Sequence, residues 1–310
     1  MGGSSSSFRY EPVEKKTIIQ KIQEADGKTD QSNYELEINN LLTSFLGQFN
    51  NRDTELIQQH ITTILNALND QIEGNILTKF GGSVNRHTHL NGISDVDALV
   101  ILNNSELANR SPQEVIDYFY DVLTTRLPKT DIEKSGKTVT LHYADGDIQL
   151  IPALRSKTGI KIPDNNSWST VIKAEAFRDR LSALNSALNN RLVPAIKLIK
   201  GIIAGFPERS QLKGYHVESL AVEIFSKHTE AEPILKDLVS SFFQKSAQLI
   251  QKPIKDVTGQ SLFVDEYLGK KESFERFMAA DNLERTYRQI ELADTGRIKS
   301  IWSELFSHME

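Results

Sequence analysis

The sequence predicts an α/β (α+β) lobe with a small mixed sheet, packed on a C-terminal lobe made only of helices, with a candidate site in the cleft between the lobes. Three observations predict this bilobed fold. The chain has 310 residues, enough for two lobes. Strand-like segments lie between residues 75 and 153, whereas helical apolar spacing prevails after residue 161. We expect a partly flexible leader at 1–33, the α/β lobe at 34–160 and the helical lobe at 161–310.

The α/β lobe begins with helices. Apolar residues recur at helical spacing over residues 34–49, and a shorter helix is possible at 14–25. A further helix follows the sequence "NNRD". Its predicted buried side consists of Leu56, Ile57, Ile61, Ile64, Leu65 and Leu68. The strand-like "NILTKF" comes next and ends at Gly81-Gly82-Ser83, a turn signal that we expect to open a helix.

The strands of this lobe are separated by one helix. An Asn91-Gly92 turn precedes "SDVDALVIL", which is strand-like with an apolar end. Ser111-Pro112 then has the pattern of an N-cap followed by the first helical residue. Two more strands are predicted at residues 137–144 and 147–153, joined by a tight Asp145-Gly146 turn.

Strand signals fade after Lys161, where "KIPDNNSW" is predicted to be a loop at the lobe boundary. The rest of the chain has the spacing of helices. These are expected at residues 170–188, 191–204, 215–227, 233–249, 273–293 and 296–306.

Composition narrows the function classes. The net charge of −5 argues against a surface that coats nucleic acid as a whole, and the absence of cysteine excludes thiolate chemistry and fits a reducing cytoplasm. No apolar run reaches the roughly 18 residues needed to span a bilayer, so we expect no membrane association. The N-terminus "MGGSSSSFRY" matches a loose myristoylation pattern, but we interpret it as a flexible Gly/Ser leader.

Two aspartates share one predicted strand. Asp95 and Asp97 are two residues apart, so in a strand both point to the same face. Two unpartnered carboxylates there raise each other's pKa, and a divalent cation removes that cost. Asp147 opens the strand "DIQLIPA", which could lie beside the first. Three carboxylates on paired strands can hold the two metal ions that catalyse in-line attack at phosphorus.

The Gly81-Gly82-Ser83 turn fits the same chemistry. Glycine lets the backbone approach a ligand closely, and a turn that opens a helix directs its N–H groups at a phosphate. Ser83 adds a hydroxyl donor. We therefore predict that Gly82 and Ser83 bind a triphosphate whose metal-bridged oxygens lie near the aspartates.

These residues resemble the nucleotidyltransferase superfamily of poly(A) polymerases, oligoadenylate synthases and cyclic GMP-AMP synthase. The family pattern is h-G-[GS]-x(9–13)-D-h-[DE]-h, with a third carboxylate on a later strand, and "FGGSVNRHTHLNGISDVDALV" is similar to it throughout, including Arg86, Thr88 and Ser94. The bacterial cGAS/DncV-like branch (CD-NTases) is the most similar. The resemblance implies two Mg²⁺ ions, with Mn²⁺ as a substitute, held by Asp95, Asp97 and Asp147, and ATP and other nucleoside triphosphates as substrates.

Later stretches extend the resemblance to about Gly269. "AIKLIKGI" looks like the basic helix of that branch, which implies that Lys200 contacts the triphosphate; Lys197 adds to a local basic excess that suits polyphosphate. "KGYHVESL" looks like the segment in which a tyrosine stacks on the donor base, here Tyr215. Gly214 departs from the family, which often has serine there.

The resemblance implies a cyclic di- or trinucleotide product, most often with adenine, made as a second messenger in anti-phage (CBASS-type) signalling. One alternative is a transferase that adds nucleotides linearly or adenylates RNA. Another is a nucleotide-binding protein that stays inactive until a partner arrives, such as a HORMA-type peptide sensor. A nucleic-acid activator also stays open.

Overall fold

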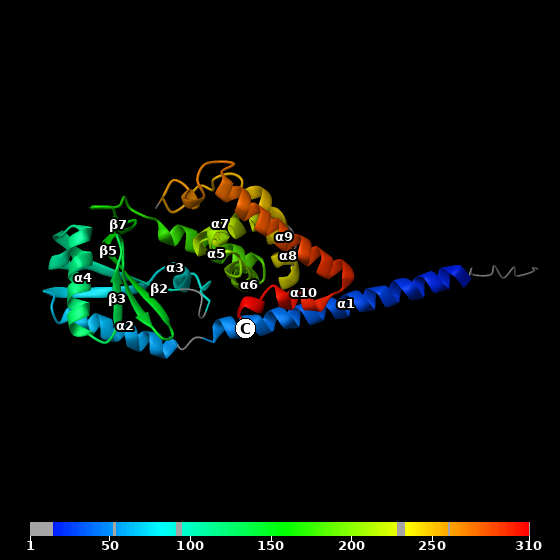
Figure 1. Ribbon diagram of the computed structural model, residues 1–310, viewed down its shortest axis with the longest axis horizontal. Helices are drawn as coiled ribbons and strands as arrows, with labels where there is room; N and C mark the ends of the chain where they lie inside the picture. Colours follow the sequence, from blue (N-terminus) through cyan, green and yellow to red (C-terminus); the bar gives the residue numbers. More distant parts are fainter. Residues whose placement is uncertain (1–14, 52–53, 91–94, 228–232, 260, 310) are drawn as a thin grey trace, which may run out of the picture.

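The computed structural model describes residues 15–51, 54–90, 95–227, 233–259 and 261–309 (Figure 1). Residues 1–14 of the predicted leader and the predicted Asn91-Gly92 turn, with the neighbouring Ser94, lie outside these residues. Two apolar cores organise the chain. One fills a sheet lobe, which contains the main sheet and the helices packed on it, and the other fills a helical lobe, which contains the N-terminal helix and the helices after residue 173.

The sheet has the order β1-β2-β5-β4-β3, with β6 beside β5. Its strands are β1 (Gly74–Phe80), β2 (Val96–Ser105), β3 (Asp131–Lys134), β4 (Val139–Tyr143), β5 (Gly146–Ser156) and β6 (Gly159–Lys161). Only β2 and β5 pair in parallel among these strands, so the sheet is mixed, as predicted. The sequence analysis did not find β3, which is four residues long with only Ile132 buried.

Two helices pack on this sheet, α2 (Thr54–Asn69) and α4 (Pro112–Arg126). The start of α4 is as predicted: Ser111 is the N-cap, its hydroxyl accepts from the Glu114 N–H, and Pro112 is the first helical residue. Val115, Ile116, Phe119 and Leu123 form its fully buried side. The very short α3 (Gly82–Asn85) follows β1 and contacts β2.

The helical lobe combines the N-terminal helix with the second half of the chain (Figure 1). Its helices are α1 (Lys15–Asn50), α5 (Ala174–Ala187), α6 (Leu192–Ala204), α7 (Gly214–Phe225), α8 (Leu235–Leu249), α9 (Phe274–Gly296) and α10 (Lys299–Glu304). One continuous helix replaces the two that the sequence suggested near the N-terminus. Short 3₁₀ turns lie at residues 106–109, 208–210, 266–268 and 307–309.

The buried side of α1 faces α6, α8 and α10 rather than the sheet. Ile38, Leu42 and Phe49 are almost fully buried in this contact. The sequence analysis had assigned residues 34–51 to the α/β lobe because they precede its strands. Packing instead joins them to the helical lobe, since their apolar stripe matches the apolar face of α6. The predicted limits at residues 34 and 160 otherwise stay a prediction.

The lobe connection that was predicted as a loop contains a small hairpin, β7 (Pro163–Asp164) and β8 (Ser167–Trp168). It packs on α4, and the Trp168 indole donates a hydrogen bond of 3.1 Å to the Arg110 carbonyl. Among the described residues, none of the helices combines the length and the apolar character that crossing a membrane requires.

Candidate active site

The turn between β1 and α3 presses its backbone against Asp97. The Gly81 N–H donates to the Asp97 carbonyl at 2.7 Å. Gly82 has a φ of +47°, and a Cβ atom on it would lie 1.5 Å from Asp97 Oδ2. Both the left-handed backbone and the close approach require glycine here. Gly82 and Asp97 therefore lie next to each other, as predicted, and Ser83 follows Gly82 in the same turn.

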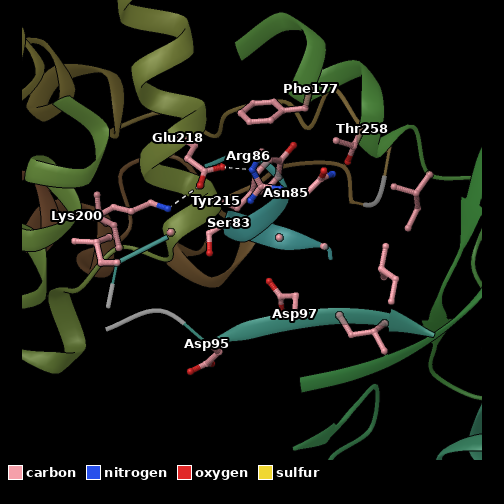
Figure 2. Close-up of a pocket in the computed structure, with 18 of the residues that line it drawn as sticks. Ser83, Asn85, Arg86, Asp95, Asp97, Phe177, Lys200, Tyr215, Glu218 and Thr258 are labelled. Atoms are coloured by element: carbon pink, nitrogen blue, oxygen red, sulfur yellow. Dashed lines mark hydrogen bonds and ion pairs between the residues drawn. The ribbon is translucent and has the colours of Figure 1, made fainter. Parts of the chain in front are cut away.

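Asp97 lies on β2 under this turn, and its carboxylate points toward Ser83 (Figure 2). Burial raises its pKa to about 6; Arg86 opposes the rise, and Asp95 adds to it. An acid with this pKa is largely ionised at neutral pH, but it carries its charge at a cost. A bound cation would remove that cost, which is the electrostatic condition expected of a metal ligand without its metal.

Asp95 immediately precedes β2 and is exposed. In Figure 2 its carboxylate points away from Ser83. Asp95 Oδ2 accepts a hydrogen bond of 2.7 Å from Gln149 Nε2 on β5. Asp95 and Asp97 line one pocket, as predicted, although their carboxylates do not converge on one point.

Asp147, the third predicted carboxylate, lies on β5 but does not line this pocket. Its Oδ1 is 2.9 Å from His142 Nδ1 on β4, and the carboxylate raises the pKa of His142. In the described part of the chain, no three acidic, histidine or cysteine side chains are grouped so that they could hold a metal ion. The role of Asp147 as a metal ligand stays a prediction.

The pocket has a volume of about 560 Å³ and lies between the lobes. Gly82, Ser83, Asp95 and Asp97 line it on the sheet side. From the helical lobe and the segments next to it come Phe177, Lys200, Tyr215, Glu218 and Thr258. The cleft thus gathers six of the eight predicted site residues, and it can hold a nucleotide-sized ligand.

A buried acid on α7 joins the two sides of the cleft. Glu218 is fully buried and accepts hydrogen bonds from Arg86 Nε at 2.5 Å, Lys200 Nζ at 2.7 Å and the Thr88 hydroxyl (Figure 2). We call these four residues the Glu218 cluster. Burial alone would raise the pKa of Glu218, but the charges of Lys200 and Arg86 outweigh it and lower the pKa. Glu218 is therefore an anion that holds both cations.

The predicted triphosphate lysines are thus engaged within the chain. Lys200 lines the pocket, but its ammonium contacts Glu218 and also donates to the Thr88 carbonyl at 3.0 Å. Lys197 lies outside the pocket, and its Nζ donates to Asn50 Oδ1 at 2.5 Å at the end of α1.

Tyr215 lines the pocket from the first turn of α7. Its hydroxyl donates to Asp256 at 2.9 Å, and its ring meets Phe177 edge-on with centroids 4.9 Å apart. The Arg86 guanidinium lies over both rings, 5.4 Å from the Tyr215 centroid and 5.8 Å from that of Phe177. Arg86 therefore covers aromatic surface on which a base would stack.

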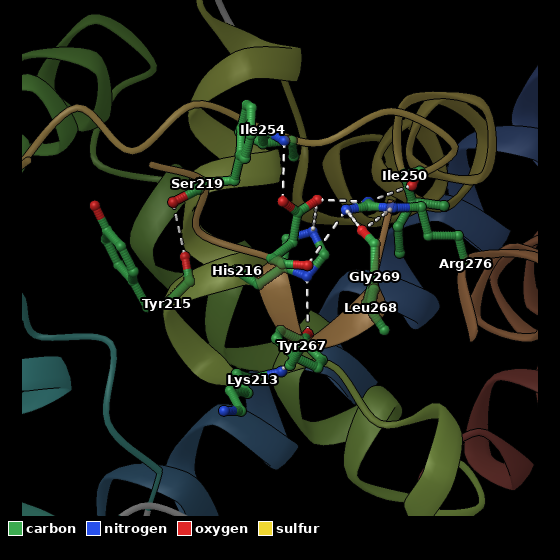
Figure 3. A network of polar contacts seen from close by, with 12 residues as sticks. Lys213, Tyr215, His216, Ser219, Ile250, Ile254, Tyr267, Leu268, Gly269 and Arg276 are labelled. Carbon is green, nitrogen blue, oxygen red and sulfur yellow. Dashed lines mark hydrogen bonds and ion pairs between the residues drawn. The ribbon is translucent and has the colours of Figure 1, made fainter. Parts of the chain in front are cut away.

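The start of α7 is fixed by a buried polar network (Figure 3). His216 Nδ1 lies 2.8 Å from the Tyr267 hydroxyl, and Arg276 forms an ion pair of 2.7 Å with Asp265, which lies 3.7 Å from His216 Nε2. His216, Asp265 and Arg276 are fully buried and Tyr267 is half-buried, so their contacts hold α7 in one orientation. Tyr215, the residue immediately before His216, is held at the pocket wall as a consequence.

Sequence reasoning missed two members of this site. Glu218 stands alone among the apolar residues of "GYHVESLAV", and an acid on an otherwise buried helix signals a basic partner. Gln149 alternates with Asp147 along β5, so its face could be inferred but not its contact with Asp95. Arg86 was noted only as part of the family resemblance.

Comparison with known protein families identifies one domain in this chain. Residues 36–185 match the family described as the Second Messenger Oligonucleotide or Dinucleotide Synthetase (SMODS) domain. No curated protein sequence matches the chain significantly.

Solved structures share the fold at low identity. CdnG, a CD-NTase from Bradyrhizobium diazoefficiens solved with GTP, is 12% identical, with a TM-score of 0.63 over 88% of this chain and 98% of its own. The Vibrio cholerae DncV cyclic AMP-GMP synthase, solved with a linear intermediate, is 11% identical, with a TM-score of 0.62 over 95% of this chain and 90% of its own. CdnC from Escherichia coli MS115-1, solved with HORMA-deltaN, is 14% identical, with a TM-score of 0.58 over 85% of this chain and 95% of its own.

The family match and the shared bilobed fold confirm the resemblance drawn from the glycine turn and the aspartate pair. The glycine turn and the aspartate pair also line the same cleft in this structure. Residues 36–185 match the SMODS domain, which identifies the chain as a nucleotidyltransferase, and its fold is similar to that of the cGAS/DncV-like CD-NTases.

Proposed function

We propose that this chain joins nucleoside triphosphates in a Mg²⁺-dependent reaction that releases pyrophosphate and yields a cyclic oligonucleotide second messenger. An adenine-containing di- or trinucleotide, made in the cytoplasm for anti-phage signalling, is the expected product. One observation carries the proposal: a single pocket has Gly82, Ser83, Asp95 and Asp97 on one side and Tyr215 on the other. This arrangement suits a triphosphate at the turn and a base at the ring.

The donor set at the turn fits a divalent cation. Two carboxylates line the pocket, and burial raises the pKa of Asp97 to about 6, so a bound cation would stabilise its charged form. Mg²⁺ is usually held by one or two carboxylates together with substrate phosphates, so Asp95 and Asp97 would hold it. When bound, such an ion stabilises charge on the reacting phosphate and polarises it for attack.

The remaining roles belong to the chain itself. The lack of a side chain on Gly82 lets the Asp97 carboxylate lie close to the backbone of the turn that would bind phosphate. The Ser83 hydroxyl is placed in the same turn to donate to them. Tyr215 offers its ring to a base, and its hydroxyl bond to Asp256 fixes the ring orientation.

The direct test incubates the protein with labelled ATP and GTP plus Mg²⁺, treats the products with phosphatase, and identifies the resistant species by mass spectrometry. Cyclic products keep their label, whereas linear products lose terminal phosphates and would favour the linear-transferase alternative. The double variant Asp95→Ala/Asp97→Ala should abolish pyrophosphate release. The exposed Asp121 on α4, changed to Ala, is the matched control. Undiminished turnover in the double variant would refute the proposal.

A second candidate is a nucleotide-binding protein that stays inactive until a partner binds. Two contacts favour it: Glu218 holds the Lys200 ammonium, and Arg86 covers the Tyr215 ring. Nucleotide binding to either group requires these contacts to rearrange. A partner such as a HORMA-type sensor, or a nucleic-acid activator, could supply the energy. Full activity of the isolated chain would exclude this candidate, and activity that appears only with a partner would support it.

A further inference from the structure

The register of the central strands identifies which side chain faces Asp97. β2 and β5 pair in parallel with Asp97 opposite Gln149 and Val96 opposite Ile148. Paired residues on neighbouring strands point to the same face of a sheet. Gln149 is therefore the immediate neighbour of Asp97 on the catalytic face. Asp147 lies two residues earlier on β5, opposite His142 of β4.

Gln149 places an uncharged amide beside both Asp95 and Asp97. Its Nε2 donates to Asp95 Oδ2 at 2.7 Å. An ionised carboxylate only accepts hydrogen bonds, so the nitrogen of the amide is the atom that faces it. This N–H offsets part of the charge of Asp95. The amide itself carries no charge, so it adds nothing to the negative charge that attracts a second divalent ion.

Asp147 has another partner. Its Oδ1 lies 2.9 Å from His142 Nδ1, and His142 Nε2 lies 3.9 Å from Glu133 on β3. Asp147 and Glu133 thus both contact His142 on the outer half of the sheet. Within the described ranges, Asp147 completes no three-residue metal group with the pair on β2.

We propose that the active site of this chain holds one divalent cation through its own carboxylates, and that Gln149 occupies the position from which a third carboxylate would bind a second ion. The proposal rests on the proposed function, since the cation enters with a nucleoside triphosphate. It replaces the predicted set of Asp95, Asp97 and Asp147 with a pair. Gln149 then positions Asp95 and limits the site to the ion that accompanies the donor.

The test counts Mn²⁺ ions, observed by electron paramagnetic resonance, in an equimolar complex of the full chain with an ATP analogue whose α,β-bridging oxygen is replaced by methylene. The wild type should bind one Mn²⁺ per complex. Gln149→Asp should bind two, because a third carboxylate then stands beside Asp97. Gln149→Glu is the second variant in case the shorter side chain disturbs folding, which thermal unfolding reports. Asp147→Asn should leave the count at one.

A wild-type count of two that falls to one in Asp147→Asn would overturn the proposal and restore the three-aspartate site. A count of one in both Gln149 variants, with folding intact, would also overturn it. The proposed function fails separately, through the absence of any nucleotide product from labelled triphosphates under every activation condition tried. Turnover offers a second readout: Gln149→Asp should raise it at saturating Mg²⁺, and that gain should be lost when Asp97→Asn is added.

Discussion

Replacing Asp97 with Asn should stabilise the metal-free protein while abolishing its catalysis. Burial raises the pKa of Asp97 from 3.8 to about 6, so its charged form is disfavoured in the folded state. At 1.36 kcal/mol per pKa unit, the cost at neutral pH is at most about 3 kcal/mol. Asn has nearly the same shape and carries no charge, so Asp97→Asn removes this cost. At roughly 2 °C per kcal/mol for a chain of this size, the unfolding midpoint should rise by several degrees.

The stability gained by Asp97→Asn should depend on pH. Because the folded pKa lies above the unfolded one, the folded state binds more protons between pH 3.8 and about 6, and the wild type loses stability as pH rises through that window. The advantage of Asp97→Asn should therefore be full at pH 7.5 and smaller at pH 5.

The assay is thermal unfolding of both proteins at the two pH values, without metal and then with Mg²⁺ and the ATP analogue. Mg²⁺ should stabilise the wild type and not the variant, since a ligand that binds only the folded state raises its stability. Asp121→Asn, an exposed change on α4, is the control. A variant that melts below the wild type at pH 7.5 without metal, or an advantage that grows at pH 5, would refute the reasoning.

Three further outcomes are expected. Gly82→Ala should reduce product formation by at least a hundredfold in the product assay, because the new Cβ would lie 1.5 Å from Asp97 Oδ2 on a backbone with φ +47°; normal turnover would contradict the close approach. Glu218→Gln should destabilise the chain by about 3 kcal/mol in urea unfolding, because Lys200 loses its buried counter-charge; an unchanged midpoint would show that the cluster adds no stability. Burial lowers the pKa of His216 from 6.5 to about 4, so the unfolded state binds more protons in that window and stability should fall as pH drops through it. His216→Gln should flatten that decline, and an unchanged slope would assign it to other groups.

The main elements followed from the sequence where local chemistry decides them. The capping box at Ser111 and the buried side of α4 needed only hydrogen-bond and periodicity rules. The pairing of β2 with β5 was expected from the position of Asp147, and the strands do pair. The sequence could predict that the glycine turn and the aspartates lie close together, because these motifs are near one another in the chain and belong to adjacent strands.

The sequence could not predict contacts between side chains that are distant in the chain. Lys200 was expected at a phosphate, yet its nearest anion is Glu218, one helix later. Lys197 is directed at α1 because that helix packs in the helical lobe, which no local signal reveals. Asp147 and Gln149 share a face of β5, and only the register and rotamers distinguish which of them approaches Asp95. The motifs thus predicted where the cleft lies, whereas tertiary contacts determine which charged and polar side chains face a ligand in it.

The chain that leaves the glycine turn is anchored in the opposite lobe. Leu90 is fully buried in the helical core, and Arg86 and Thr88 are bound to Glu218 of α7. The turn itself is bonded to β2 through the Gly81 N–H. A rotation of one lobe against the other therefore cannot leave this turn unstrained. A movement of one lobe relative to the other would therefore change how this turn lies against Asp97.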